Sequence, residues 1–222
     1  MKIAFVTECD YYLDGEALGG CDLVLFPFYT GGVVSYNKEI KGVTNFFRTL
    51  TNLSKRLKST VIAGVDTDSY GIVRHSAAAI DGGKLLGISD MTTAYENEKY
   101  VGGGTLRVYD TRAGKIGVAV GWDALSSDCV KTLALCGADV IVNIADTVLG
   151  GITGVSSRAK AYEFGVPIAV CAYKNAMLCG TNGEMIFSSP QKISVATVRT
   201  EKDYHLVTLR RRGKKHNGEH GI

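Results

Sequence analysis

Short apolar runs separated by glycine-rich turns dominate the chain. Several of these runs contain no polar residue, which is typical of strands that are buried on both faces of a sheet. Glycine pairs and triplets lie between them, as expected for tight turns. The runs that predict strands are Ile3–Thr7, Asp22–Pro27, Thr60–Val65, Ile116–Gly121, Val140–Asn143, Ile168–Ala172 and Ile193–Val198.

Two further patterns predict β-hairpins. Gly71–Ile80 and Lys84–Ser89 flank the turn sequence Asp81-Gly82-Gly83, and Thr105–Tyr109 and Lys115–Val120 flank the segment 110–114. Asp-Gly and Gly-Gly steps supply the positive φ angles that tight hairpin turns require. The sheets are therefore expected to contain antiparallel as well as parallel pairs.

Three helices are predicted between the strands. The first runs from Tyr36 to Lys58, where apolar residues recur at helical spacing. The second begins at Ser126 or Ser127, whose hydroxyl can cap free amides, and ends before Gly137. The third begins near Ser156 and ends at Gly165. Helices that alternate with buried strands and hairpins indicate the α/β class with mixed sheets.

The composition is that of an ordinary globular protein. The chain has 222 residues, of which 45% are hydrophobic and 21% are charged, so a single domain is expected. No apolar run approaches the roughly 20 residues that cross a bilayer, and the first ten residues resemble a strand more than a signal peptide. The six cysteines show neither CxxC nor zinc-finger spacing. We therefore predict a cytoplasmic protein with no metal and no cofactor.

Positive charge is concentrated at the C-terminal end. The segment 210–222 holds three Arg, two Lys and one Glu, while the net charge of the whole chain is only +3. A basic tail can contact nucleic acid or acidic membranes, but a solvated terminus is the commoner case. We predict a single domain over residues 1–209 and a basic tail over 210–222, with no nucleic-acid and no membrane partner.

Four stretches in order resemble the nitrilase superfamily of carbon–nitrogen hydrolases. They are CDLVLFPFYTGG, GGKLLGISDMTTAYENEKYVGGG, GKIGVAVGWDALSSDCVKTLALCGADVIVN and SSRAKAYEFGVPIAV. Together with the N-terminal strand they cover nearly the whole chain, and the third is the most specific. The resemblance implies a four-layer αββα sandwich with two mixed sheets, and a homodimer, because members of the family commonly form dimers.

The resemblance also identifies three positions at which this chain departs from the family. Members use a Glu as general base, a Lys that stabilises the oxyanion and a Cys nucleophile. Here the Glu position is Phe28, the Lys position is Asp90 or Met91, and the Cys position is Gly121. Phe28 cannot accept the thiol proton, and Gly121 has no side chain that could attack a carbonyl carbon. Neither Asp90 nor Met91 can present a cation to an oxyanion, and Asp90 would repel it.

We interpret the chain as a pseudoenzyme with a ligand-binding or assembly role. The alternative is an amidase- or nitrilase-type hydrolase with altered catalytic residues. Cys129, eight residues after Gly121, is the nearest substitute nucleophile in the sequence. It is expected inside a helix, away from the turn at Gly121, and beside Asp128, which disfavours a thiolate.

A vestigial cavity is expected where the family binds its substrate. Glu96, with Glu98 as second choice, matches an accessory Glu of the family, and Trp122 and Asp123 also fit the family pattern. The residues predicted to bind a small ligand are Phe28, Tyr29, Asp90, Met91, Glu96, Trp122 and Asp123. The competing interpretation is that the cavity filled with side chains once catalysis was lost.

Two other segments carry polar groups of possible interest. Asp66 and Asp68 stand close together but lack the rest of a calcium loop, so we predict a turn at the end of a strand. Lys174 and Asn175 are expected on a surface loop.

Overall fold

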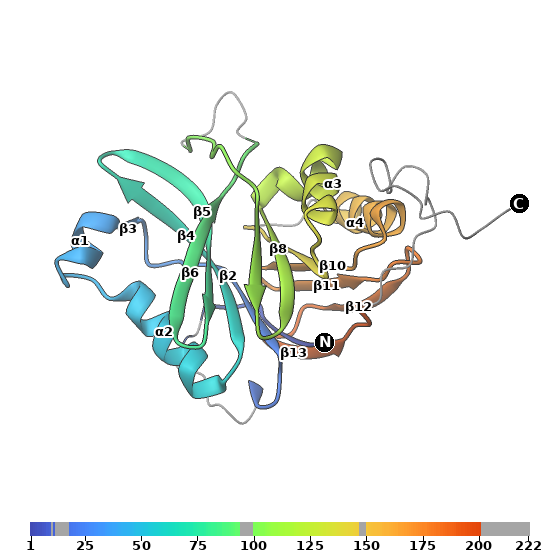
Figure 1. The fold of residues 1–222 in the computed structure, drawn as a ribbon, viewed down its shortest axis with the longest axis horizontal. Helices are drawn as coiled ribbons and strands as arrows, with labels where there is room; N and C mark the ends of the chain where they lie inside the picture. Colours follow the sequence, from blue (N-terminus) through green and yellow to red (C-terminus); the bar gives the residue numbers. More distant parts are fainter. Residues whose placement is uncertain (10, 12–17, 94–99, 147–149, 201–222) are drawn as a thin grey trace, which may run out of the picture.

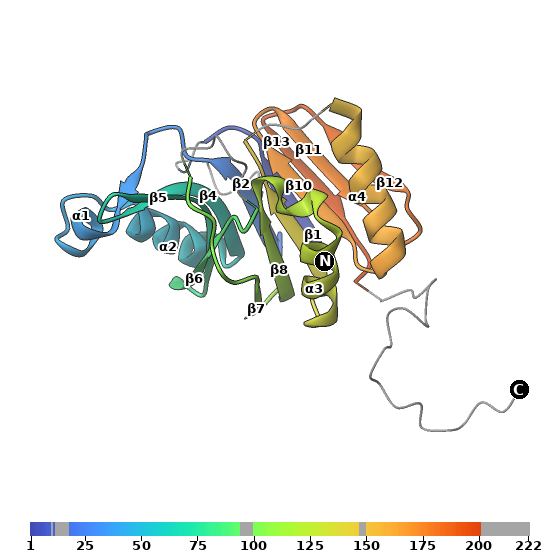
Figure 2. The ribbon, with the colours of Figure 1, turned by 90° about the horizontal axis from the view of Figure 1, so that it is seen from above.

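Two stacked β-sheets with helices on their outer sides form the protein (Figures 1 and 2). The computed structural model describes residues 1–9, 11, 18–93, 100–146 and 150–200. The predicted basic tail, 210–222, lies outside the described residues. No helix in the described ranges is long and apolar enough to cross a membrane.

The first sheet has seven strands. Their order is β13-β1-β2-β4-β5-β6, with β3 paired to β4, and β1, β2 and β4 run parallel. The strands are β1 (Lys2–Val6), β2 (Leu23–Phe28), β3 (Val34–Ser35), β4 (Thr60–Ser69), β5 (Ile72–Asp81), β6 (Lys84–Asp90) and β13 (Ile193–Thr197). The parallel β1, β2 and β4 lie in the middle of the sheet.

The second sheet has six strands. Their order is β12-β11-β10-β9-β8-β7, and β8, β9 and β10 run parallel. The strands are β7 (Arg107–Thr111), β8 (Gly114–Val120), β9 (Val140–Ile144), β10 (Ile168–Ala172), β11 (Asn175–Cys179) and β12 (Met185–Ser189). Both sheets therefore combine parallel and antiparallel pairs, as predicted.

Three apolar clusters hold four layers together. One fills the space between the sheets and includes Phe5 and Val120. A second packs α2 (Phe46–Leu57) onto the first sheet through residues such as Leu50, and a third packs α3 (Ser127–Leu135) and α4 (Gly150–Phe164) onto the second sheet. Figure 2 shows these helices on opposite outer sides. The predicted αββα sandwich is confirmed.

The two hairpins and the second helix formed as predicted. β5 pairs with β6 and β7 with β8, each antiparallel. Helix α3 begins after Ser126, whose hydroxyl accepts a hydrogen bond from the Cys129 amide. These elements depend on residues close together in the sequence, so local patterns are sufficient to identify them.

The helix predicted from Tyr36 to Lys58 is in fact two helices. α1 (Tyr36–Ile40) ends at a turn in which Gly42 has φ +69° and Val43 is exposed. The Glu39 carboxylate then accepts hydrogen bonds from the backbone amides of Phe46 and Phe47 and caps α2. A charged cap at the start of α2 satisfies amides that a continuous helix would have paired internally.

Three other predictions need correction. α4 begins at Gly150, six residues before the predicted start near Ser156. β4 continues through Asp66 to Ser69 instead of turning there, and a two-residue turn with positive φ at Tyr70 and Gly71 leads into β5. Asn175 begins β11 and is not part of a surface loop, while Lys174 lies in the tight turn before it.

Candidate functional site

The site lies where several strands from both sheets end. Parallel strands in one sheet place their carboxyl ends at the same edge, and this is where α/β proteins bind ligands. Phe28 ends β2, Gly121 follows β8, and Asp146 comes two residues after β9. The antiparallel hairpin β4–β5 adds Asp66 and His75 from the facing sheet.

Gly121 forms a sharp turn between β8 and the short 3-10 helix η2 (Gly121–Leu125). Its φ is +55°, a left-handed conformation that favours glycine. A Cβ atom at this position would lie 2.7 Å from Met91 Sδ and 3.3 Å from His75 Cδ2. A strand-to-helix turn of this kind resembles the elbow on which hydrolases expose a nucleophile, but here it presents no side chain.

The structure separates the two residues proposed for the Lys position. Met91 is buried in the cluster between the sheets and faces Gly121. Asp90 accepts a hydrogen bond from Ser76 at 2.8 Å and lies 3.7 Å from the Arg74 guanidinium. Met91 therefore occupies the space beside the turn, whereas Asp90 does not line the cavity and is engaged elsewhere.

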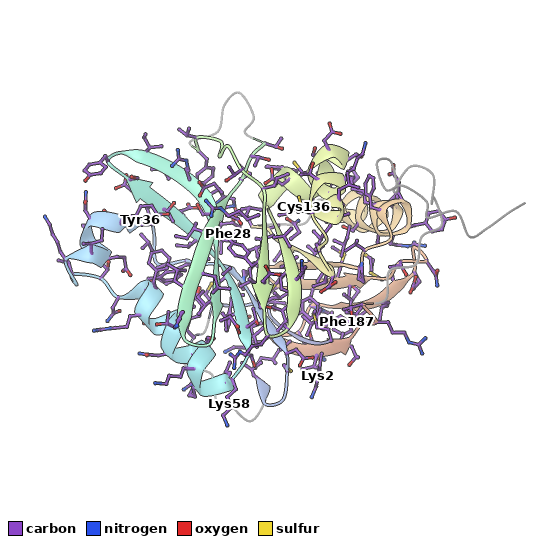
Figure 3. The ribbon with its side chains drawn as sticks, in the orientation of Figure 1. Lys2, Phe28, Tyr36, Lys58, Cys136 and Phe187 are labelled. Carbon is purple, nitrogen blue, oxygen red and sulfur yellow. The ribbon has the colours of Figure 1, made fainter. Side chains whose placement is uncertain are left out.

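Phe28 reaches the same region from β2. It follows a bulge at Pro27, and it lies so close to Gly64 that a Cβ atom there would come within 2.9 Å of its backbone and ring. The absence of a side chain at Gly64 makes room for the ring. The Phe28 ring then stacks on the His75 imidazole, with centroids 3.5 Å apart and an angle of 7° between the planes. Figure 3 labels Phe28 in the middle of the molecule, between the sheets.

His75 is held by two carboxylates. Its Nδ1 lies 2.7 Å from Asp66 Oδ1 and its Nε2 lies 3.2 Å from Asp146 Oδ1. The Tyr100 hydroxyl donates to the other oxygen of Asp66 at 2.8 Å, and the Tyr100 ring lies 4.6 Å from the imidazole centroid. The imidazole is thus enclosed by acids at its edges and by aromatic rings next to its faces.

This enclosure favours the charged form of His75. Burial lowers the pKa of the ring, but the hydrogen bonds and charges of Asp146 and Asp66 outweigh it, so the pKa is raised above its ordinary value. A proton on each ring nitrogen lets both carboxylates accept a hydrogen bond. The neutral ring would direct a lone pair at one of them.

We expect this ion triad to make the stability of the protein pH-dependent. A raised folded-state pKa contributes stability that is complete below the unfolded pKa of about 6.5 and is lost as pH rises through the folded value. The melting temperature should therefore fall as the pH rises above about 6.5. Thermal unfolding of wild type and His75→Gln over this range measures the effect, and an equally steep fall in the variant would contradict it.

Asp123 has a structural role, because its carboxylate joins two segments of the chain. Its side chain is fully buried, and its carboxylate accepts hydrogen bonds from the Thr92 amide, the Thr92 hydroxyl and the Thr93 amide at 2.9–3.0 Å. It therefore fastens the segment after β6 to η2. This contact helps to set Met91 next to Gly121, and Asp123 itself lines neither of the two cavities at the site.

Two adjoining hollows remain at the site. The inner one is small, about 80 Å³, and its lining includes His75, Met91, Gly121 and Trp122. The outer one is about 230 Å³, and its lining includes Phe28 and Tyr29. The site is therefore partly filled by side chains but is not closed. Glu96 and Glu98 lie outside the described residues.

The sequence patterns did not identify Asp66, His75, Tyr100 and Asp146. Asp66 and His75 stand equally far from the Tyr70–Gly71 turn, so a longer β4 would have predicted that they pair across the hairpin. No sequence signal connects Asp146 with them. In the described part of the chain, no group of three or more His, Cys, Asp or Glu side chains could hold a metal ion.

Comparison with known proteins adds independent information on ancestry. A family model described as carbon-nitrogen hydrolase matches residues 9–206. A probable nitrilase of Schizosaccharomyces pombe is 24% identical over 192 residues, which cover 80% of this chain and 69% of that protein.

Solved structures show the same fold. Nit3 of Saccharomyces cerevisiae, a member of the nitrilase superfamily, matches with a TM-score of 0.72 and 16% identity over 99% of this chain and 96% of its own. A carbon-nitrogen hydrolase from Helicobacter pylori matches with a TM-score of 0.75 and 15% identity over 95% and 91%. An amidase from Nesterenkonia sp. matches with a TM-score of 0.70 and 16% identity over 88% of each chain.

Proposed function

This chain belongs to the carbon–nitrogen hydrolase family, and we propose that it is a member that no longer hydrolyses C–N bonds. The observation behind the proposal is that Phe28, Met91 and Gly121 meet at one place. Gly121 faces Met91 and His75, and His75 stacks on Phe28. Three positions that are far apart in sequence thus come together as the parts of one catalytic site should.

None of the three side chains can perform the family's chemistry. The related Nesterenkonia amidase has been solved with the acetamide moiety of fluoroacetamide added covalently to its active-site cysteine. In this chain the equivalent turn has glycine, and the neighbouring groups are a phenyl ring and a thioether. Functions that act as a unit are lost almost completely when the nucleophile is missing.

His75 does not offer a replacement general base. A base needs a free ring nitrogen within hydrogen-bond reach of the proton that it abstracts. Both nitrogens of His75 are already engaged by carboxylates, and the hydrogen bonds and charges of these carboxylates outweigh burial, so the pKa of the ring is raised and its protonated form is favoured. The ion triad therefore supports a structural role over a catalytic one.

The cysteines near the site are also poor nucleophiles. Cys129 lies in α3, is buried beside the Thr92 hydroxyl and does not line either hollow. Cys9 lines the outer hollow, but burial raises the pKa of its thiol, and the thiol contacts the Phe28 carbonyl oxygen at 2.7 Å. A reactive cysteine requires surroundings that favour the thiolate, and neither position provides them.

The experiment is ammonia release from a panel of nitriles, primary amides and N-carbamoyl compounds. We expect no release above buffer from the wild type, and none from Gly121→Cys, because the base and the cation are still absent. The triple variant Phe28→Glu, Met91→Lys, Gly121→Cys tests whether restoring these three side chains is sufficient for hydrolysis. An active amidase of the family serves as the positive control.

One outcome would overturn the proposal. Wild-type turnover that survives a second purification and disappears in a single cavity variant, such as His75→Gln, would mean that the site uses new chemistry. The alternative of an amidase or nitrilase with altered residues would then hold.

An assembly role is the second part of the proposal. The outer face of α4 exposes Ile152 and Val155 at 64% and 67%, and Met185 of β12 lies beside Gly154. Exposed apolar patches commonly mark interfaces between proteins. We expect a homodimer through this face, with a molar mass by light scattering of two chains that falls to one in Val155→Asp. A monomeric wild type would contradict it.

A further inference from the structure

The outer hollow has the composition of a cation site. Its volume is about 230 Å³, and it is lined by Cys9, Pro27, Phe28, Tyr29, Thr30, Asp66, Tyr100, Asp146 and Tyr173. These residues come from the end of β2, from β4 and from the segments that follow β1, β2, β6, β9 and β10. It adjoins the inner cavity, with which it shares Tyr100 and Asp146.

Four aromatic rings contribute to its walls. The face of an aromatic ring carries partial negative charge and attracts a cation placed within about 6 Å of the centroid. One such cation–π contact is present at the hollow, where Lys174 Nζ lies 5.3 Å from the centroid of the Tyr173 ring. Tyr173 is 56% exposed, so its ring can receive a ligand from solvent.

Two carboxylates, Asp66 and Asp146, line the hollow. Asp66 is fixed, since one of its oxygens pairs with His75 and the other accepts from the Tyr100 hydroxyl. Asp146 is 54% exposed and uses Oδ1 for His75. None of the described residues that line the hollow is Lys or Arg. With His75 charged, the triad of two acids and one imidazolium carries one negative charge, and the Lys174 ammonium over the Tyr173 ring is the cation with which a ligand would compete.

We propose that the outer hollow binds a small organic cation, a molecule with an ammonium or quaternary ammonium group. The aromatic walls supply the attraction to a weakly hydrated cation, and Asp146 supplies the counter-charge. The volume is below the roughly 300–1,000 Å³ of pockets for drug-sized ligands, so the ligand is small. The two carboxylates disfavour anions. This inference names the ligand class of the proposed non-catalytic site, and it rests on that proposal.

The test compares choline with 3,3-dimethylbutan-1-ol, a neutral molecule of nearly the same shape. Trp122 is the only tryptophan in the chain and lines the adjoining cavity, so its fluorescence serves as the reporter, with calorimetry as a second readout. We expect choline to bind saturably and about tenfold or more tightly than the alcohol, because only the cation interacts with the rings and the carboxylate. Equal binding of the two molecules, or no binding of choline, would overturn the proposal.

Four variants of the full chain sharpen the test. Asp146→Asn removes the carboxylate charge at nearly constant side-chain shape, and with it the ion pair to His75. It should weaken choline about tenfold without affecting the alcohol. Tyr173→Leu, at an exposed position that contributes little to folding, should weaken choline as well. Lys174→Asn removes a competing cation with a residue that tolerates the left-handed backbone, and it should tighten binding. Asp110→Asn, on an exposed hairpin, is the control and should have no effect.

The two proposals fail in different ways. Absence of choline binding together with absence of ammonia release would overturn the cation site and leave the proposed loss of hydrolysis intact. Ammonia release from the panel would overturn the proposed loss of hydrolysis whatever the result with choline. Unchanged choline binding in both Asp146→Asn and Tyr173→Leu would place the ligand outside this hollow and would also overturn the cation site.

Discussion

Replacing Asp123 with alanine is expected to lower the free energy of unfolding by about 2–4 kcal/mol, because it leaves the amides of Thr92 and Thr93 without their acceptor. The carboxylate is fully buried and both of its oxygens accept from this segment. For a domain of this size each kcal/mol shifts the melting temperature by about 2–4 °C. Thermal and denaturant unfolding of the purified variant measure the loss.

Two companion variants show whether the loss has this cause. Asp123→Asn keeps the shape but directs an NH₂ group at an amide donor, so it should also be destabilising. Asp110→Ala removes a carboxylate that is 85% exposed, and its effect should stay within about 0.5 kcal/mol. If Asp123→Ala were as mild as Asp110→Ala, Asp123 would not hold the segment after β6 in place.

Replacing Gly121 with alanine is expected to cost about 2–5 kcal/mol from two sources. The left-handed backbone, with φ +55°, costs about 1–2 kcal/mol for a residue with a Cβ atom. The 2.7 Å approach of that atom to Met91 Sδ adds an overpacking cost of about 1–3 kcal/mol. Equilibrium unfolding of the variant in urea gives the sum.

A matched glycine separates the two sources. Gly82 has φ +59° and nothing within 4 Å of its ideal Cβ position, so Gly82→Ala reports the backbone cost alone. Gly121→Ala combined with Met91→Ala should lose less stability than the sum of the single variants, by about 0.5–3 kcal/mol, because shortening Met91 removes the overlap. Equal costs at the two glycines, or strict additivity, would show that Met91 does not fill the space beside the turn.

The predictions for Asp123 and Gly121 concern contacts that hold one part of the site together. Asp123 holds the segment that carries Met91, and Met91 occupies the space into which a side chain at position 121 would point. Under the proposed function, the side chain of a cysteine introduced at position 121 therefore contacts the Met91 thioether, which occupies the space that a substrate would need. Placing a cysteine at position 121 while Met91 is kept leaves the backbone at that position strained. It also leaves the site without a cation that could stabilise an oxyanion.

The sequence alone was sufficient for the features that depend on neighbours in the chain. The apolar runs identified the parallel strands at the centres of both sheets, and the Asp81-Gly82-Gly83 step identified one hairpin. Ser126 identified the start of α3, because a cap acts on amides two or three residues away. The resemblance at the sequence level also predicted that the family's functional groups are missing at positions 28, 90 or 91 and 121, and this stays a prediction.

Tertiary structure alone decided how distant residues meet. A one-residue ambiguity placed either Asp90 or Met91 opposite Gly121, and only the stacking of the two sheets shows that Met91 points inward. The contact of Asp146 with His75 and Asp66 also has no local signal, since His75 and Asp66 pair within the first sheet and Asp146 follows a strand of the second. Their contact arises because strand ends from two stacked sheets converge at one edge, where the carboxylates favour the charge on the imidazole between them.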